Sequence, residues 1–376
     1  MRLGTTMKGD AGMKSLSAAC LLGIALSLVA PNDSRAQPAA GPDSPVRPNS
    51  VPAKLIPAPT ISPEFVRIWQ SIVVRSAGQA NNSPAPDDLR AWADAWEKTE
   101  AMLAPLSDSI IARYRVTVTD LKLGGVPVLS VVPENWTNDG RVLVYLHGGA
   151  FTALSAHSTL HESALMAART GIKVISVDYT IAPQAHWGQI TDQVVSVYRA
   201  MLSLDYRPQS VGVWGDSAGG SIVAGSVLKL REAGLPMPAA MVLWAPWSDV
   251  SMAGDTYTTL ADFDPSLSIA SLKASAAAYA DPSEQKNPYV SPVYGDYSKG
   301  FPPTLIQAGT REIFLSNAVR QYQAISAAGI PATLDLYEGM PHVFQPIGPD
   351  TPEGVLAMRK VTSFWNAQLR HTPGRR

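Results

Sequence analysis

One serine lies where a predicted strand turns sharply into a predicted helix. Residues 211–214 alternate β-forming and small residues, whereas residues 217–232 carry apolar side chains at helical spacing. Between them stands Gly215-Asp-Ser-Ala-Gly219, a G-x-S-x-G sequence. Such a turn lifts the hydroxyl of Ser217 above the sheet edge, where a base can reach it and a helix N-terminus favours negative charge. The pattern predicts that Ser217 is a nucleophile.

A second glycine-rich segment follows a continuous apolar strand predicted at residues 141–146. It reads His147-Gly-Gly-Ala-Phe151. Acyl transfer needs N–H donors directed at the oxygen that becomes negative in the tetrahedral intermediate. We predict that Gly148, Gly149 and the N–H of Ala218 form this oxyanion hole. His147 precedes Ser217 in the chain, so we interpret it as a structural histidine and not as the base.

The elements that must position these residues alternate along most of the chain. Apolar runs predict strands at 114–119, 126–132, 141–146, 173–178, 211–214, 240–245, 304–308 and 333–337. Helical spacing predicts helices at 63–106, 158–170, 188–204, 217–233, 315–328 and 353–370. Together they predict a largely parallel sheet with helices on both faces, and such sheets bind ligands at the carboxyl ends of their strands. Residues 249–300 interrupt the alternation and are a candidate piece of a lid.

The general base is expected to follow the serine, because in this architecture the order is nucleophile, acid, histidine. His342 and His371 are the histidines that come after Ser217. His371 lies in a polar tail, whereas His342 lies in a tight loop after the strand at 333–337. We therefore predict that His342 is the base.

The acid between them is a choice among several carboxylates. The candidates are Asp249, Asp281, Glu312, Asp335 and Glu338. The partner must lie at the carboxyl end of a strand close to His342, which leaves Asp249 and Glu312. Glu312 follows the strand that should neighbour the one leading to His342. We predict Glu312 as the acid and keep Asp249 as the alternative.

With these positions in place, the sequence resembles the hormone-sensitive-lipase-like family of α/β-hydrolases, the bacterial esterases with HGGG and GDSAGG motifs. The resemblance covers about residues 110 to 370. It rests on His147-Gly-Gly-Ala-Phe151, Val177-Asp-Tyr179 with Ala182-Pro183, Gly215-Asp-Ser-Ala-Gly-Gly220, Pro246-Trp-Ser-Asp249 and Gly339-Met-Pro-His-Val-Phe344. The family's glycine-x-x-acid segment matches Gly309-Thr-Arg-Glu312, with glutamate where aspartate is commoner.

The resemblance implies an α/β-hydrolase fold with a mostly parallel eight-stranded sheet and a helical cap. The cap would combine the N-terminal helices at 63–110 with an insertion at about 249–300 in the catalytic domain, residues 111–376. It also implies hydrolysis of carboxylic esters, usually with short-to-medium acyl chains, without cofactor or metal. The sequence departs from the family at Ala150, which replaces the third glycine, and at Thr180-Ile181, Gln184 and residues 186–189.

Composition limits the other functions. The 376 residues carry 30 basic and 31 acidic side chains, which gives no electrostatic argument for binding nucleic acid. The one cysteine, Cys20, excludes a disulfide framework or a thiolate metal cluster.

The N-terminus is predicted to be a signal peptide over residues 1–36, with Met13 as the true start. Lys14 precedes an apolar run that ends at Ala30, and Ser34-Arg-Ala36 offers the small residues of a cleavage site. Residues 37–62 are rich in proline and predict an extended linker. We therefore expect a periplasmic or secreted protein without a stable membrane span in its mature form.

Other functions stay open at this point. A lactone, amide or carbamate hydrolase would use the same residues as an esterase. A non-catalytic small-molecule-binding protein on the same fold would typically lack the serine or the histidine, and both are present here.

Overall fold

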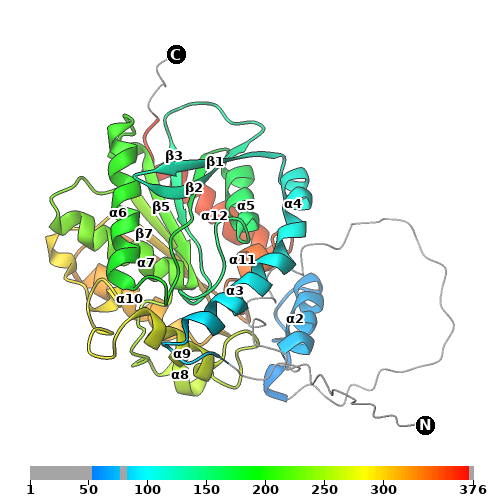
Figure 1. Ribbon diagram of the computed structural model, residues 1–376. Helices are drawn as coiled ribbons and strands as arrows, with labels where there is room; N and C mark the ends of the chain where they lie inside the picture. The colour runs from blue at the N-terminus through cyan, green and yellow to red at the C-terminus, as the bar shows by residue number, and fades with distance from the viewer. Residues whose placement is uncertain (1–52, 77–82, 372–376) are drawn as a thin grey trace, which may run out of the picture.

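The computed structural model describes residues 53–76 and 83–371 (Figure 1). The predicted signal peptide, Met13 and most of the predicted linker lie outside the described residues.

Within the described residues, eight strands form one sheet in the order β1-β2-β4-β3-β5-β6-β7-β8. They are β1 (Val116–Leu123), β2 (Val126–Pro133), β3 (Val142–Leu146), β4 (Lys173–Val177), β5 (Val211–Asp216), β6 (Ala240–Trp244), β7 (Thr304–Gly309) and β8 (Ala332–Tyr337). Strand β2 pairs antiparallel with β1 and β4, whereas all other pairs are parallel. This arrangement confirms the predicted mostly parallel eight-stranded sheet.

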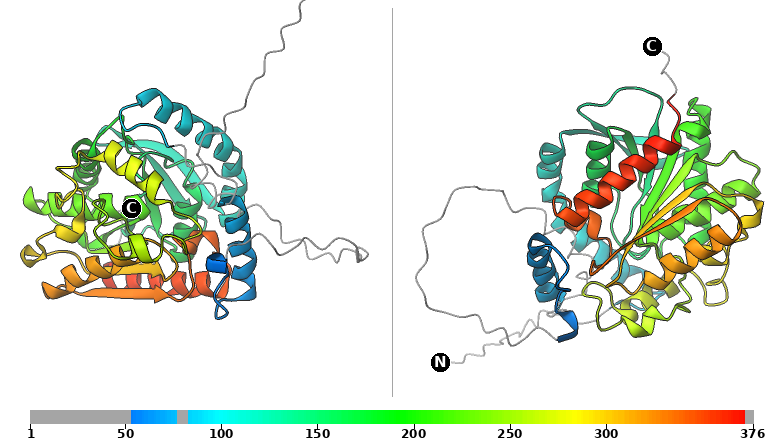
Figure 2. Two further views of the ribbon diagram at one scale, coloured as in Figure 1. Left: turned by 90° about the horizontal axis from the view of Figure 1, so that it is seen from below. Right: turned by 180° about the vertical axis from the view of Figure 1, so that it is seen from behind.

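Helices cover both faces of the sheet. Helices α6 (Trp187–Ser203), α7 (Ser217–Glu232) and α10 (Leu315–Ala327) lie on one face. Helices α5 (Leu160–Thr170) and α12 (Pro352–Gln368) lie on the other, where α12 crosses the sheet in the rear view of Figure 2. The short helix α11 (Phe344–Ile347) packs against α12.

The central strands are largely apolar because their two faces pack into two separate cores. In β3, Val142, Val144 and Leu146 belong to the apolar cluster under α6 and α7. The intervening Leu143 and Tyr145 belong to the cluster under α5 and α12. This alternation follows from the two-residue period of a strand, and it explains the continuous apolar run in the sequence.

The remaining helices lie outside the two layers. Helices α2 (Pro63–Ser76), α3 (Leu89–Leu103) and α4 (Ser107–Tyr114) precede the sheet, and α8 (Thr256–Thr259) and α9 (Ile269–Tyr279) lie in the insertion between β6 and β7 (Figure 1). Single turns of 3-10 helix are η3 (Ala53–Leu55), η4 (Ala104–Leu106), η5 (Pro208–Ser210), η6 (Pro292–Tyr294) and η7 (Tyr297–Lys299). α3 and α9 lie close together across the carboxyl ends of the strands in both figures.

Two predicted boundaries are wrong. The first strand begins at Val116 and not at residue 114, because α4 continues to Tyr114 and ends at Arg115 in the left-handed conformation, with φ of 52°. The predicted linker ends earlier than residue 62. Ala58 and Ile61 are buried in an apolar cluster with Phe65 and Trp69 of α2. Apolar side chains spaced among the prolines allow this stretch to pack.

The tryptophans of the N-terminal helices pack against the body. Trp69 is fully buried, and Trp92 joins the cluster under α6 and α7. Trp96 donates a hydrogen bond from Nε1 to the carbonyl oxygen of Leu154, at 3.1 Å. Helix α3 is thereby fixed beside the loop that follows His147. Across the described residues, no helix is both long and apolar enough to cross a membrane.

Candidate active site

Ser217 occupies a strained turn between β5 and α7. Its φ is 52°, a left-handed conformation that is uncommon for a residue with a side chain, and it is buried. A Cβ on Gly219 would lie 2.0 Å from the carbonyl oxygen of Leu146, and one on Gly215 would lie 2.5 Å from the backbone of Gly219. Both glycines are therefore required by close backbone approach, as the G-x-S-x-G pattern predicts.

The residue before the serine ties the turn to the neighbouring strand. Asp216 Oδ1 accepts hydrogen bonds from the hydroxyl of Tyr145, at 2.7 Å, and from the N–H of Gly148, at 3.0 Å. Burial raises the pKa of the Asp216 carboxyl, and the nearby charge of His342 opposes this rise. Neither Asp216 nor Tyr145 is predicted from the sequence to belong to the site. The hydroxyl of Tyr145, the one polar side-chain group in β3, is the signal that was available.

This contact corrects the prediction for Gly148. Its N–H already donates to Asp216, so it has no further hydrogen to give to an oxyanion. Gly148 instead permits close approach, since a Cβ there would lie 2.3 Å from Asp216 Oδ2. Among the described residues, no acceptor is recorded for the N–H groups of Gly149, Ala150 and Ala218.

The loop after β3 has the conformation that such donors need. Gly149 has φ of 109°, and a Cβ there would lie 2.1 Å from the carbonyl oxygen of Ala153. Ala150 and Phe151 follow with φ of 53° and 68°. Three successive residues with positive φ turn the backbone sharply in front of Ser217. The insertion also contacts this loop: the rings of Phe151 and of Tyr279 in α9 stack with their centroids 3.7 Å apart.

His147 is a buried structural residue. Its ring stacks on Tyr179 with centroids 4.1 Å apart, and its Nδ1 lies 2.8 Å from the carbonyl oxygen of Gly148. Burial lowers the pKa of His147 to about 4. The hydroxyl of Tyr179 donates to the carbonyl oxygen of His147, at 2.7 Å. These contacts fix the start of the glycine-rich loop.

The structure brings Glu312 and His342 together. His342 Nδ1 lies 2.8 Å from Glu312 Oε2, and Glu312 Oε1 accepts the N–H of Gly309 at 2.6 Å. Both side chains are buried, with 5% and 0% exposed. Because a carboxylate only accepts hydrogen bonds, this contact places the proton on Nδ1 and leaves Nε2 with a free lone pair.

The loops that carry these two residues are packed on one another. Arg311 donates its N–H to the carbonyl oxygen of Met340, at 3.0 Å. A Cβ on Gly309 would lie 2.0 Å from that same oxygen. Glu312 therefore reaches His342 because β7 and β8 are neighbouring parallel strands whose ends meet at one edge.

Aromatic contacts connect His342 with the serine turn. The backbone N–H of Trp247 donates to the carbonyl oxygen of Ser217, at 2.9 Å. The rings of Trp247 and Phe314 stack with centroids 5.3 Å apart, and Phe314 meets the His342 ring edge-on at 5.1 Å. Trp247, Phe314 and His342 are all buried. The two aromatic rings therefore shield the imidazole from water on the side of Ser217.

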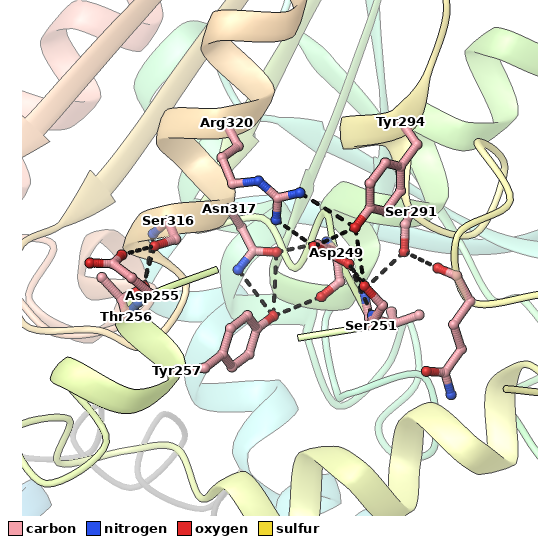
Figure 3. Close-up of polar contacts among 12 residues, drawn as sticks. Asp249, Ser251, Asp255, Thr256, Tyr257, Ser291, Tyr294, Ser316, Asn317 and Arg320 are labelled. Carbon is pink, nitrogen blue, oxygen red and sulfur yellow. Dashed lines mark hydrogen bonds and ion pairs between the residues drawn. The ribbon is translucent and has the colours of Figure 1, made fainter. Parts of the chain in front are cut away.

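Asp249, the alternative acid, lies in a different network (Figure 3). Its carboxylate forms an ion pair with Arg320 and accepts hydrogen bonds from Ser251 at 2.6 Å and Tyr294 at 3.2 Å. Its backbone N–H donates to Asn317 Oδ1, at 2.7 Å. The network joins both ends of the insertion to α10, and no contact between Asp249 and His342 is recorded among the described residues.

A buried carboxylate that the sequence does not predict lies beside the loop that carries Glu312. Asp264 Oδ2 accepts the N–H of Ile313 at 2.8 Å, and its Oδ1 accepts those of Ser266 and Leu267 at 2.7 and 3.0 Å. Burial raises the pKa of Asp264 to about 6, and the charge of His342 opposes the rise. Nothing in the local sequence distinguishes this aspartate from a loop residue.

Comparisons with known proteins agree with the fold. Residues 143–346 match the family model described as alpha/beta hydrolase fold. The chain is 34% identical to an acetyl-hydrolase of Streptomyces hygroscopicus over 60% of this chain and 75% of that protein. It is 31% identical to an esterase of Acinetobacter venetianus over 70% of this chain and 87% of that protein.

A solved esterase of the bacterial hormone-sensitive lipase family superposes with a TM-score of 0.73 and 31% identity, over 82% of this chain and 99% of that chain. The chain belongs to the hormone-sensitive-lipase-like family of α/β-hydrolases. Within that family it is a carboxylesterase-type hydrolase.

Proposed function

We propose that the protein hydrolyses carboxylic esters with short-to-medium acyl chains through Ser217, His342 and Glu312. The observation that carries this proposal is the buried contact between His342 Nδ1 and Glu312, beside a serine held at φ of 52°. A nucleophile on a strained turn with a base of fixed tautomer meets the requirements of acyl transfer.

The reaction begins when Ser217 Oγ attacks the carbonyl carbon and His342 Nε2 takes the hydroxyl proton. The N–H groups of Gly149, Ala150 and Ala218 stabilise the oxyanion that forms. His342 returns its proton to the departing alcohol, and the acyl group stays on the serine. A water molecule then attacks the acyl-enzyme by the same steps and releases the acid. Glu312 keeps the proton on Nδ1 and stabilises the imidazolium throughout.

The aromatic wall supports a preference for small acyl groups. Phe151, Trp247, Tyr279 and Phe314 are fully buried around the site. Because these large rings pack on one another, they should restrict the space for an acyl chain. The name of one relative, an acetyl-hydrolase, agrees with a small acyl group. We expect preference for acyl chains of about two to eight carbons over long-chain lipids.

The test compares the wild type with Ser217→Ala on p-nitrophenyl esters of increasing chain length, with lactones and amides alongside. Alanine fits the turn, so the variant should fold, and turnover should fall by about 10⁵-fold or more. Full activity in the folded variant would show that Ser217 is not the nucleophile. Faster turnover of emulsified long-chain lipid, lactone or amide than of a soluble butyrate ester would refute the substrate class.

We also propose that the protein is exported, on the strength of residues 14–36 of the sequence. The mature chain should then begin near Gln37 in the periplasm or medium. N-terminal sequencing of the protein from each cell fraction tests this, and a cytosolic protein that retains residues 14–36 would contradict it.

A further inference from the structure

A short segment before α2 lies over the loops that carry the proposed base and acid. It comprises residues 54–61 and is here called the strap; it is the dark blue stretch leading into α2 in Figure 1. The strap is fixed at both ends. Trp69 Nε1 donates to the carbonyl oxygen of Leu55, at 2.8 Å, and the next residue, Ser62, donates its N–H to Glu353 of α12, at 2.6 Å.

The middle of the strap packs on the His342 loop. The loop turns at Gly339, where φ is 73°, and a Cβ there would lie 2.6 Å from Ile61 Cγ2 and 3.0 Å from Ala58 Cβ. Ala58 and Ile61 are both buried, and Thr60 donates a hydrogen bond to the carboxylate of Glu338. The strap therefore leaves no room for the loop to move outward at Gly339.

The start of the strap also meets the acid loop and the insertion. The carbonyl oxygen of Lys54 accepts a hydrogen bond from Arg311 Nη1, at 3.1 Å, one residue before Glu312. The ammonium of Lys54 pairs with Asp262 of the insertion. Exposed ion pairs of this kind contribute little stability, so the buried contacts of Ala58 and Ile61 carry most of the restraint.

We infer that Ala58, Thr60 and Ile61 are positioning residues, which hold the His342 loop in the geometry that catalysis requires. The inference rests on the proposed role of His342 as base. His342 follows Gly339 by three residues, and its Nδ1 must stay within hydrogen-bond distance of Glu312. A displacement of about 1 Å in such a group can lower turnover by about 100-fold.

The experiment uses the full chain with the paired substitution Thr60→Val and Ile61→Ala, which removes the hydrogen bond and the apolar contact. We expect kcat on p-nitrophenyl butyrate to fall by about 10-fold or more with KM within about twofold, because the acyl site is untouched. Hydrogen exchange of the peptide covering residues 338–344 should become faster. Thr60→Ser with Ile61→Val, which keeps both contacts, should restore kcat.

The matched control is Val73→Ala on α2, which removes a buried side chain from the same apolar cluster but lies outside the strap. It should lower the thermal midpoint while leaving kcat within about twofold. If the strap variant keeps wild-type kcat, or if Val73→Ala lowers kcat equally, the positioning role is wrong. His342→Ala separates the two proposals. An active His342→Ala refutes the base itself, whereas an inactive one with an unaffected strap variant refutes only the strap.

Discussion

Glu312 and Asp249 are buried carboxylates that follow neighbouring parallel strands, yet their partners differ in kind. Glu312, after β7, contacts the imidazole of His342 and one backbone N–H. Asp249, after β6, contacts the guanidinium of Arg320, two hydroxyl groups and one backbone N–H. Both are 0% exposed, so burial does not distinguish them.

The difference lies in what each partner can do with a proton. A guanidinium keeps its proton at every accessible pH, so the Asp249–Arg320 pair has one state and can only hold structure together. An imidazole can both accept and release a proton, so the Glu312–His342 pair can support proton transfer. The two carboxylates are equally buried, but the partner beside each one decides its role: Asp249 holds structure together, and Glu312 can support proton transfer.

The largest expected effect tests this comparison through turnover. Glu312→Gln should lower kcat by about 1,000-fold or more, because a neutral amide neither fixes the tautomer of His342 nor stabilises its positive charge. Asp249→Asn should keep kcat within about tenfold once folded protein is compared. The measurement is kcat per active, folded molecule, with folding checked by circular dichroism.

The opposite result would reverse the assignment. If Asp249→Asn is inactive and Glu312→Gln turns over at a near-normal rate, Asp249 is the acid and the contact between Glu312 and His342 is only structural.

A smaller effect should appear in stability, and it should be unequal between the two members of the Asp249 pair. Arg320→Met leaves the carboxylate of Asp249 charged and fully buried, which should cost about 3 kcal/mol or more. Asp249→Asn leaves the side chain of Arg320, which is 31% exposed and can be hydrated, so it should cost about 1 kcal/mol. Denaturant unfolding of both variants measures the difference; equal losses would show that Asp249 is not the uncompensated charge.

The sequence predicted the elements of the fold well because each carries a local signal. The buried strands are apolar runs, and the helix after Ser217 begins where the G-x-S-x-G turn ends. The start of β1 was predicted too early because α4 continues to Tyr114 and ends at Arg115 in the left-handed conformation. Glycine is the usual residue in that conformation, so an arginine there gives no sequence signal of a helix end. The packing of residues 54–61 was missed because it depends on a loop almost three hundred residues later.

The same distinction applies to the site. Ser217, His342 and the choice of Glu312 follow from motif order and strand adjacency, which the sequence contains. The hydrogen bond from the N–H of Gly148 to Asp216 does not follow from the sequence. Gly148 and Gly149 are indistinguishable there, because the sequence does not show the hydrogen-bond partner of each N–H. The network around Arg320 was also invisible, since its members come from four separate segments (Figure 3).

A third buried carboxylate, Asp264, extends the comparison, because its recorded partners in the described residues are all backbone N–H groups. With no ion pair recorded for it there, burial dominates and the pKa of Asp264 rises from its ordinary 3.8 to about 6. The folded protein therefore binds this proton more tightly than the unfolded chain does. The stability that this group contributes is complete below its ordinary pKa and is lost as the pH rises through about 6.

Asp264→Asn should remove that pH dependence, because asparagine keeps the shape and one acceptor oxygen but does not ionise. The thermal midpoint of the variant minus that of the wild type should therefore increase between about pH 4 and about pH 7, and become constant above that range. Taking the difference cancels the titration of every group that the two proteins share, so the small effect can be measured. The nearby charge of His342 opposes the rise in the pKa of Asp264 without reversing it, so the sign of the slope is kept. A difference that stays constant with pH, or that falls as the pH rises, would show that the three N–H donors compensate for burial as fully as a cation does.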